Sequence, residues 1–331
     1  MTIAHESSSI HLVSFMPWVT SPVRRFLRLS PNEANFETRG FAAADPLRQL
    51  ALEEAGRAFI GGYNVALSTT RVASIVEYVD GLAAANRGFA VEGAAMSAAI
   101  VDALQIPGHL LAALLEAFGR NFTYLVHVGS GWSFAYLPWR RRQIVRLLDP
   151  IHSWLAFDGL GFHDTYFHHT GILAGWRRRG SGYVLRAYDQ GVGRALWFIA
   201  GGSTTKAAGL IADFPAGRQS DLWSGLGLAM AYAGPMNADE IEGACLRAGI
   251  HKYCFAQGIA FACEARVRAS YVPSHTDLAA RSVCRTDAQL LAQLVRDARA
   301  NLPGSDGDPP RYELWRQAVA AALSRTMERR Q

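Results

Sequence analysis

The chain has 331 residues, of which 50% are hydrophobic and 18% are charged, and its formal net charge is +5. This composition excludes a disordered chain and predicts a globular protein with a large core. The basic excess lies in short arginine runs without interleaved aromatic residues, Arg140–Arg142, Arg177–Arg179 and Arg329–Arg330, so nucleic acid is not an expected partner.

The same inspection sets the expected compartment. No apolar segment is long enough for a membrane span, and the first 18 residues lack the pattern of a secretory signal. The four cysteines, Cys245, Cys254, Cys263 and Cys284, show no CxxC spacing, which indicates reduced thiols rather than a disulfide framework or a zinc site. We therefore expect a cytoplasmic protein.

Helix is predicted over most of the chain, because Ala, Leu, Arg, Glu and Gln dominate and alternating β-branched runs are few. One strand is predicted at 182–189 (GYVLRAYD), and residues 301–310 read as a loop whose last two prolines begin a final helix. The fold class is therefore mainly α with minor β. The predicted helices are 46–61, 70–79, 88–104, 108–118, 122–137, 142–156, 192–201, 205–213, 220–233, 238–248, 251–268, 285–300 and 310–328.

An internal comparison suggests a duplication. GRAFI at 56–60 aligns with GRALW at 193–197, and EGAAMSAA at 92–99 aligns with GLGLAMAYA at 225–233. A third match pairs Gly129 with Gly258. These ordered matches predict two pseudo-repeated helical halves, about 45–140 and 190–270, joined by an unduplicated insert at 141–190. The predicted organisation is an N-terminal extension (1–44), one helical domain (45–300), and a linker with a C-terminal helix (301–331).

The insert contains DPIHSWLAFDGLGFHDTYFHHT at 149–170, where aspartates and histidines stand among aromatic residues. Asp158, His163 and Asp164 are the candidate catalytic groups, because ionisable side chains in an apolar setting must be paired, bind something or shift their pKa. Helix capping and pairing with arginines explain the same pattern. The two glycines of FDGLGF suggest a helix break. No metal is predicted, since the spacing of standard ligand motifs is absent.

DQGVGRALWF at 189–198 offers a second candidate. Glycines ahead of a helix, with Arg194 in its first turn, can hold an anion. An alternative is that Arg194, like Arg57, forms a partly buried ion pair, for Arg194 with Asp189, Asp221 or Glu92. A nucleotide site is not predicted, because the GxG lacks its βαβ context and GGSTTK at 201–206 lacks the P-loop spacing.

Glycine and alanine recur at three- and four-residue spacing in RGFAVEGAAM, GSGWSFA and DLWSGLGLAMAYAG. Such residues let helices approach closely, and their cost in helix stability is offset by tight packing or by room for a ligand. Aromatic residues flank these segments, so an elongated apolar pocket is expected beside the alternative of an aromatic core. The flanking residues are Trp132, Trp154, Trp197, Trp223, Phe89 and Phe162.

Together the motifs resemble a known family. RGFAVEGAAM, VGSGWSFAYLPW, DPIHSWLAFDGLGFHDTYF, DQGVGRALWF, DLWSGLGLAMAYAG, QGIAFACEAR and HTDLAA follow one another over residues 30 to 285. They resemble the UnbL-type domain-of-unknown-function family of bacterial enediyne biosynthesis gene clusters; AYAGPMN departs from the expected glycine pair. The resemblance implies maturation of a polyene-like apolar polyketide chain and assigns no reaction. Its motif positions here include Arg87, Glu92, Asp158, His163, Asp189, Arg194, Arg218, Asp221 and Trp223.

The expected function is that of a cofactor-independent acid–base enzyme acting on an apolar unsaturated substrate. His163 with Asp158 or Asp164 would move protons, and Arg194 and Arg218 would hold an anionic end. The alternatives are a non-catalytic binding or scaffold protein, and a metal or haem protein using His163, His168 or His169.

Other enzymes of the same pathway are expected as partners, and the sequence is compatible with a homodimer. The predicted substrate-binding residues are Arg57, Arg87, Glu92, Trp132, Trp154, Asp189, Arg194, Arg218, Asp221 and Trp223.

Overall fold

The computed structural model describes residues 22–42, 45–69, 71–104, 109–175 and 180–328. Among these residues there are helices and no strand. Residues 1–21 of the predicted N-terminal extension and the arginine runs 177–179 and 329–330 lie outside the described residues. In the first part of the chain the α-helices are α1 (Pro22–Leu27), α2 (Phe36–Arg39), α3 (Pro46–Ser68), α4 (Val72–Asp80), α5 (Ala84–Leu104), α6 (Leu110–Phe118), α7 (Thr123–Trp132) and α8 (Arg141–Val145).

The second part of the chain continues in the same way. The α-helices are α9 (Leu155–Leu173), α10 (Tyr183–Ile199), α11 (Thr204–Ala212), α12 (Ala216–Tyr232), α13 (Ala238–Ala248), α14 (Lys252–Arg268), α15 (Ser274–Cys284), α16 (Ala288–Ala300) and α17 (Arg311–Glu328). Short 3₁₀ turns connect several of them: η2 (Pro31–Ala34), η3 (Ser133–Ala135), η4 (Pro138–Arg140), η5 (His152–Trp154) and η6 (Gly249–His251).

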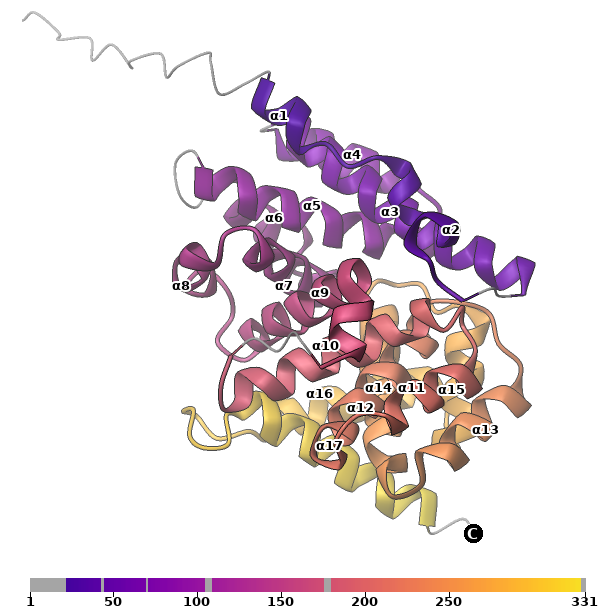
Figure 1. The fold of residues 1–331 in the computed structure, drawn as a ribbon. Coiled ribbons are helices and arrows are strands. Elements are labelled where there is room, and N and C mark those ends of the chain that lie inside the picture. The colour runs from indigo at the N-terminus through magenta and orange to yellow at the C-terminus, as the bar shows by residue number, and fades with distance from the viewer. Residues whose placement is uncertain (1–21, 43–44, 70, 105–108, 176–179, 329–331) are drawn as a thin grey trace, which may run out of the picture.

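The long helices form a row in which each packs on the next. Contacts run from α3 to α5, then to α7, α9, α10, α12 and α14 in chain order (Figure 1). Helices α16 and α17 then pack on α14 and on each other. Long helices that follow one another in the chain are therefore also neighbours in space.

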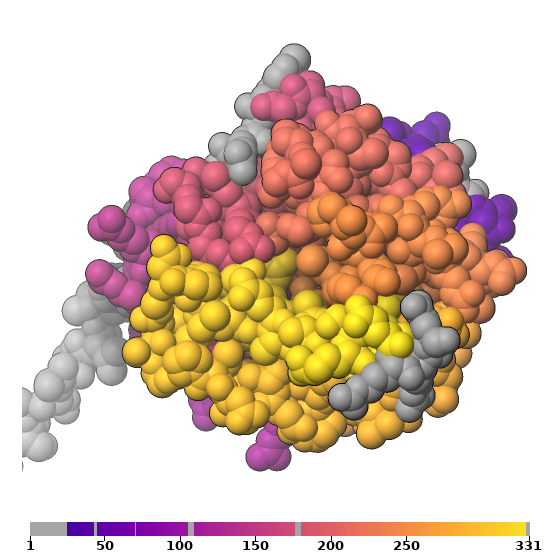
Figure 2. All heavy atoms as spheres, turned by 90° about the horizontal axis from the view of Figure 1, so that it is seen from below, coloured from indigo at the N-terminus to yellow at the C-terminus, as the bar shows by residue number. Residues whose placement is uncertain are grey.

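The C-terminal helix α17 covers one face of this row. Residues coloured yellow spread across the face seen in Figure 2, beside the salmon and orange segments of the middle of the chain. Trp315 is buried and its indole Nε1 donates a hydrogen bond of 2.8 Å to the carbonyl of Val295 in α16. Tyr312, also buried, donates a hydrogen bond of 3.0 Å to Gln190 in α10. Helix α17 therefore shares the core of the helices before it.

Glycines set the spacing between neighbouring helices. A Cβ added at Gly62 of α3 would lie 1.9 Å from the carbonyl oxygen of Ala90 in α5, and one at Gly93 of α5 would lie 1.9 Å from that of Phe59 in α3. Main chains this close leave no room for a side chain at the contact. The same kind of contact joins Gly129 to Glu92, Gly159 to Val128, Gly131 to Ala156, Gly161 to Tyr188, Gly191 to Asp158, Gly193 to Leu222, Gly225 to Gln190, Gly227 to Phe255 and Gly258 to Ser224.

These contacts recur through the whole row, so the division into two halves and an unduplicated insert is not confirmed. Contact glycines lie at intervals from 30 residues (Gly129 to Gly159) to 36 residues (Gly93 to Gly129). The sequence match of Gly129 to Gly258 spans four such intervals, with Gly159, Gly191 and Gly225 between. The recurring unit in the structure is thus one long helix with its connection.

Three local predictions were wrong. The helix predicted at 142–156 is interrupted, because α8 ends at Val145 and α9 begins at Leu155, with Pro150 between them. The predicted helices also omit most of α9 and all of α15. The predicted strand 182–189 is the first half of α10, because this segment packs along its length between α9 and α12, and packing overrides the β-propensity of its aromatic and branched residues. The helix break expected at FDGLGF is absent, since Gly159 and Gly161 lie inside α9 and face carbonyls of α7 and α10. The non-helical residue of α9 is His168, with φ −138° and ψ 38°.

The glycine contacts give a first prediction. We expect Gly62→Ala to lower the free energy of unfolding by about 1–3 kcal/mol or more, because its Cβ would collide with the main chain of α5. Gly209→Ala in α11 is the matched control, since a Cβ there meets nothing within 4 Å; it should raise stability by about 0.5–1 kcal/mol. Urea unfolding followed by circular dichroism measures both. Equal effects of the two substitutions would contradict the packing role.

Candidate functional site

Three charged side chains from three helices meet in the interior. Arg194 of α10 donates a hydrogen bond from Nη1 to Oδ1 of Asp158 in α9 over 2.5 Å, and its Nη2 lies 3.6 Å from Oε1 of Glu92 in α5. Glu92 also accepts a hydrogen bond of 3.1 Å from the indole of Trp132 in α7. All these residues are buried, and the guanidinium lies 4.9 Å from the ring centre of Phe162. We call Glu92, Asp158 and Arg194 the charged triad.

The glycine contacts bring the triad together. Glu92, Asp158 and Arg194 each stand next to a contact glycine in the sequence, namely Gly93, Gly159 and Gly193. Because the helix main chains nearly touch at these glycines, side chains beside them can meet across more than one helix. An aspartate side chain is short, so this contact depends on the close approach of α9 and α10.

Burial and pairing act on the carboxyl groups in opposite directions. Burial raises the pKa of Asp158, and it also raises the pKa of Glu92, while the nearby Arg194 guanidinium opposes both shifts. One cation faces two carboxyl groups, so full ionisation of the triad leaves an excess negative charge in the interior. The arrangement therefore favours a proton on one of the two carboxyl groups. The second oxygen of Asp158, Oδ2, is buried and has no hydrogen-bond partner in the structure.

Two narrow apolar cavities of about 50 Å³ each flank the triad. We name them the Glu92 cavity and the Asp158 cavity after the triad carboxyl group in the wall of each. The Glu92 cavity is lined by Leu29, Glu33, Ala55, Gly56, Phe59, Ile60, Phe89, Glu92, Trp132, Phe162, Tyr166, Phe167, Arg194, Phe198, Leu228, Ala229, Tyr232 and Ala233. The Asp158 cavity is lined by Tyr124, Leu125, Val128, Leu155, Asp158, Arg194, Leu228, Tyr232, Phe261, Glu264, Ala265, Val295 and Trp315.

The two cavities share the walls formed by Arg194, Leu228 and Tyr232. The hydroxyl of Tyr232 is buried without a hydrogen-bond partner, and burial raises the pKa of this phenol. Neither Leu228 nor Tyr232 was predicted from the sequence to lie at a site. Their spacing from the contact glycine Gly225, three and seven residues along α12, places all three on one helix face, and this spacing was the available signal.

His163 and Asp164, the other candidate catalytic residues, lie elsewhere on α9. Asp164 accepts a hydrogen bond of 3.1 Å from the hydroxyl of Tyr188, and its Oδ1 lies 3.4 Å from Nδ1 of His163. The His163 ring packs edge-on against Trp132 and Tyr136. Both residues are buried and neither lines the two cavities. The structure therefore groups Asp158 with Arg194 and Glu92, and His163 with Asp164.

Metal binding by the histidines of α9 gains no support from the geometry. Within the described ranges, no group of three or more His, Cys, Asp or Glu side chains is placed to hold a metal ion. His169 instead packs edge-on against Phe41.

Of the predicted substrate-binding residues, Glu92, Trp132 and Arg194 lie at the cavities. Arg57 is 37% exposed and pairs with Glu53 one turn earlier in α3, at 3.3 Å. Arg87 donates hydrogen bonds to the carbonyls of Asp80 and Leu82, where α4 ends. Arg57 therefore forms an ion pair within α3, and Arg87 caps the end of α4.

Of the predicted aromatic residues, too, some line a cavity and others pack elsewhere in the core. Trp154 packs edge-on against Tyr183, and Trp223 packs edge-on against Phe255. Neither tryptophan lines either cavity. Phe89 and Phe162, which also flank the small-residue helices in the sequence, do line the Glu92 cavity.

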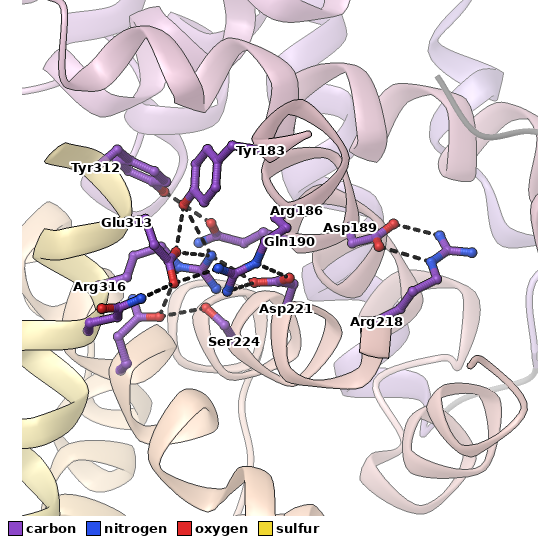
Figure 3. Close-up of polar contacts among 12 residues, drawn as sticks. Tyr183, Arg186, Asp189, Gln190, Arg218, Asp221, Ser224, Tyr312, Glu313 and Arg316 are labelled. Carbon is purple, nitrogen blue, oxygen red and sulfur yellow. Dashed lines mark hydrogen bonds and ion pairs between the residues drawn. The ribbon is translucent and has the colours of Figure 1, made fainter. Parts of the chain in front are cut away.

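Asp189, Arg218 and Asp221 belong to buried ion pairs away from the cavities. Figure 3 shows Asp189 and Arg218 as a pair by themselves, joined by two hydrogen bonds of 2.5 and 2.9 Å. Asp221 lies in a larger cluster, where it contacts Arg186 of α10 at 3.0 Å and Arg316 of α17 at 2.8 Å. This cluster ties α17 to α10 and α12. The pairs expected between Arg194 and Asp189 or Asp221 are therefore not the ones that form.

Comparison with known proteins identifies a family. The family described as Protein of unknown function (DUF1702) matches residues 19–323, which is nearly the whole chain. No curated protein and no solved structure matches the chain. Over the part of the chain that is described, no helix has both the length and the apolar character that a membrane crossing needs.

The triad gives a second prediction. We expect Arg194→Met to lower the free energy of unfolding at pH 7 by about 3–5 kcal/mol, because it leaves two buried carboxyl groups without a cation. Arg57→Met is the control, since loss of this partly exposed pair at the surface should cost about 1 kcal/mol. Urea unfolding at pH 7 and at pH 4.5 measures both variants.

The pH dependence has a defined sign. Burial raises the pKa of Asp158 and of Glu92 in the folded chain, so their contribution to stability is present at low pH and is lost as the pH rises through the folded pKa values. Without the guanidinium these pKa values rise further. The decrease in unfolding free energy caused by Arg194→Met should therefore be smaller at pH 4.5 than at pH 7. A decrease that does not depend on pH would contradict the role assigned to Arg194.

Proposed function

The chain belongs to the DUF1702 family, whose function is unknown, and we propose that it is a cofactor-independent acid–base enzyme for an apolar unsaturated small molecule. The apolar cavities beside the triad support this proposal. The resemblance to the UnbL-type family supports a substrate from an enediyne or polyene-like polyketide pathway. The description of the matching family names neither UnbL-type proteins nor enediyne clusters.

The observation that carries the proposal is the placement of two carboxyl groups with raised pKa in the walls of apolar cavities. A buried carboxyl group with a raised pKa keeps its proton to higher pH than a solvated one, so it can act as a general acid, and its conjugate base can remove a proton. Arg194 would hold Asp158 in one orientation and stabilise its anion. The unpartnered Oδ2 of Asp158 is the atom available for proton transfer.

This proposal moves the leading catalytic assignment from His163 to Asp158 and Glu92. It also changes the expected charge of the substrate. Arg194 already contacts both carboxyl groups, and Arg218 is paired with Asp189 away from the cavities. An anionic substrate end would add negative charge to a site that already holds two carboxyl groups, so a neutral substrate fits better.

We further propose that the protein works in the cytoplasm with other enzymes of its pathway, as a monomer or a homodimer. The cysteines support a reducing compartment, because Cys245, Cys254, Cys263 and Cys284 are free thiols.

A third prediction tests the enzyme against a pure binding protein. Native mass spectrometry of freshly purified protein should show a bound neutral apolar compound. When that compound is extracted and incubated with the protein in D₂O, an acid–base enzyme should convert it or introduce deuterium at carbon. Asp158→Asn and Glu92→Gln should slow this exchange by about 10²–10⁴-fold, the usual contribution of a general acid or base.

His163→Gln is the discriminating variant, and thermal unfolding should show that every variant is folded. If His163→Gln still introduces deuterium at the wild-type rate and Asp158→Asn does not, the result supports proton transfer by the triad. The reverse pattern would show that the His163–Asp164 pair moves the proton. An extracted compound that returns unchanged from the wild-type protein would reject catalysis in favour of binding and shielding.

A further inference from the structure

The two cavities have different carboxyl groups and a common boundary. Glu92 lies in the wall of one cavity and Asp158 in the wall of the other, whereas Arg194 and Tyr232 lie in both. Hydrocarbon and aromatic side chains make up most of the remaining lining. Glu33 and Glu264 also line the cavities, but each pairs with arginines outside the lining, Arg39 for Glu33 and Arg268 and Arg296 for Glu264. Because Arg194 and Tyr232 belong to both linings, the shared wall carries polar groups between two largely apolar spaces.

Two buried polar atoms of residues that line these cavities lack hydrogen-bond partners. They are Oδ2 of Asp158 and the hydroxyl oxygen of Tyr232, and both residues are at least 95% buried, with exposed fractions of 1% and 5%. Buried polar atoms in native proteins are almost always hydrogen-bonded, so these two point to a group supplied from outside the chain. A ligand hydroxyl group can satisfy either atom, because it can donate to a carboxylate and accept from a phenol.

We infer that the ligand is a neutral apolar molecule whose hydroxyl or similar hydrogen-bonding group lies between two hydrocarbon arms, one arm in each cavity. This inference rests on the proposed binding at the triad and adds where the polar group stands in the ligand. A ligand with its polar group at one end would leave one of the two cavities unfilled.

Size and charge narrow the choice further. Each cavity, at about 50 Å³, has roughly a third of the volume of an engineered cavity that binds benzene. A short alkyl arm is therefore what each cavity accepts without rearrangement. A carboxylate between the arms would face both Glu92 and Asp158, so a neutral donor is the group that fits.

A fourth prediction uses two isomeric alcohols as probes. Heptan-4-ol has a propyl arm on each side of its hydroxyl group, and heptan-1-ol has a single long arm. We expect the full-length protein to bind heptan-4-ol about tenfold more tightly, measured by isothermal titration calorimetry. Equal affinities, or tighter binding of heptan-1-ol, would overturn the inference. Tyr232→Phe, which removes only the unpartnered hydroxyl, should weaken heptan-4-ol about tenfold and leave the isomers closer in affinity.

Matched variants that fill one cavity at a time separate this inference from the proposed function. Ala55 lines the Glu92 cavity and Ala265 lines the Asp158 cavity, and both are buried helical alanines. Ala55→Leu and Ala265→Leu should each weaken heptan-4-ol at least tenfold. Ala55→Val and Ala265→Val replace them if thermal unfolding shows that the leucine variants are not folded.

The outcomes are distinct. Loss of binding only on filling the Glu92 cavity overturns the two-arm ligand and leaves the proposed function standing. Absence of binding of either alcohol to the wild-type protein overturns the proposed binding at the triad and this inference with it. Weakening by both substitutions supports a ligand that spans the boundary at Arg194 and Tyr232.

Discussion

The close approach of neighbouring helix main chains is the constraint on which this structure depends. At each step of the row a glycine faces a carbonyl oxygen of the next helix, at a distance that no Cβ could occupy. Such packing offsets the intrinsic cost of glycine in a helix, because long stretches of main chain come into van der Waals contact. The row α3–α5–α7–α9–α10–α12–α14 is built from this one contact repeated.

The charged triad is a consequence of that geometry. Asp158 reaches Arg194 although its side chain is short, because Gly191 and Gly159 allow α9 to approach α10 and α7. Glu92 is held by Arg194 on one side and by the indole of Trp132 on the other. Two carboxyl groups share one guanidinium in a buried setting, and the burial that raises their pKa is also what suits them for proton transfer.

The other buried charged residues differ from the triad in their hydrogen bonds. Asp189 with Arg218, and Asp221 with Arg186 and Arg316, are paired by close hydrogen bonds and lie away from the cavities. They join helices, including α17, to the row. At the triad, by contrast, Oδ2 of Asp158 is left without a partner beside a cavity. A carboxylate oxygen without a partner, in a residue that lines a cavity, distinguishes the candidate site from the structural pairs better than charge or burial alone.

The sequence by itself determined the helical class, most helix positions and the use of small residues in packing, because these follow from local propensity and periodicity. It also marked Glu92, Asp158 and Arg194 as notable residues. It did not determine that they meet, since pairing between α5, α9 and α10 depends on which helices become neighbours. For the same reason the strand at 182–189 was predicted wrongly, and Tyr232 was missed. Only the tertiary structure decided which charges are satisfied and which atoms face a cavity, because both depend on contacts between residues far apart in the chain.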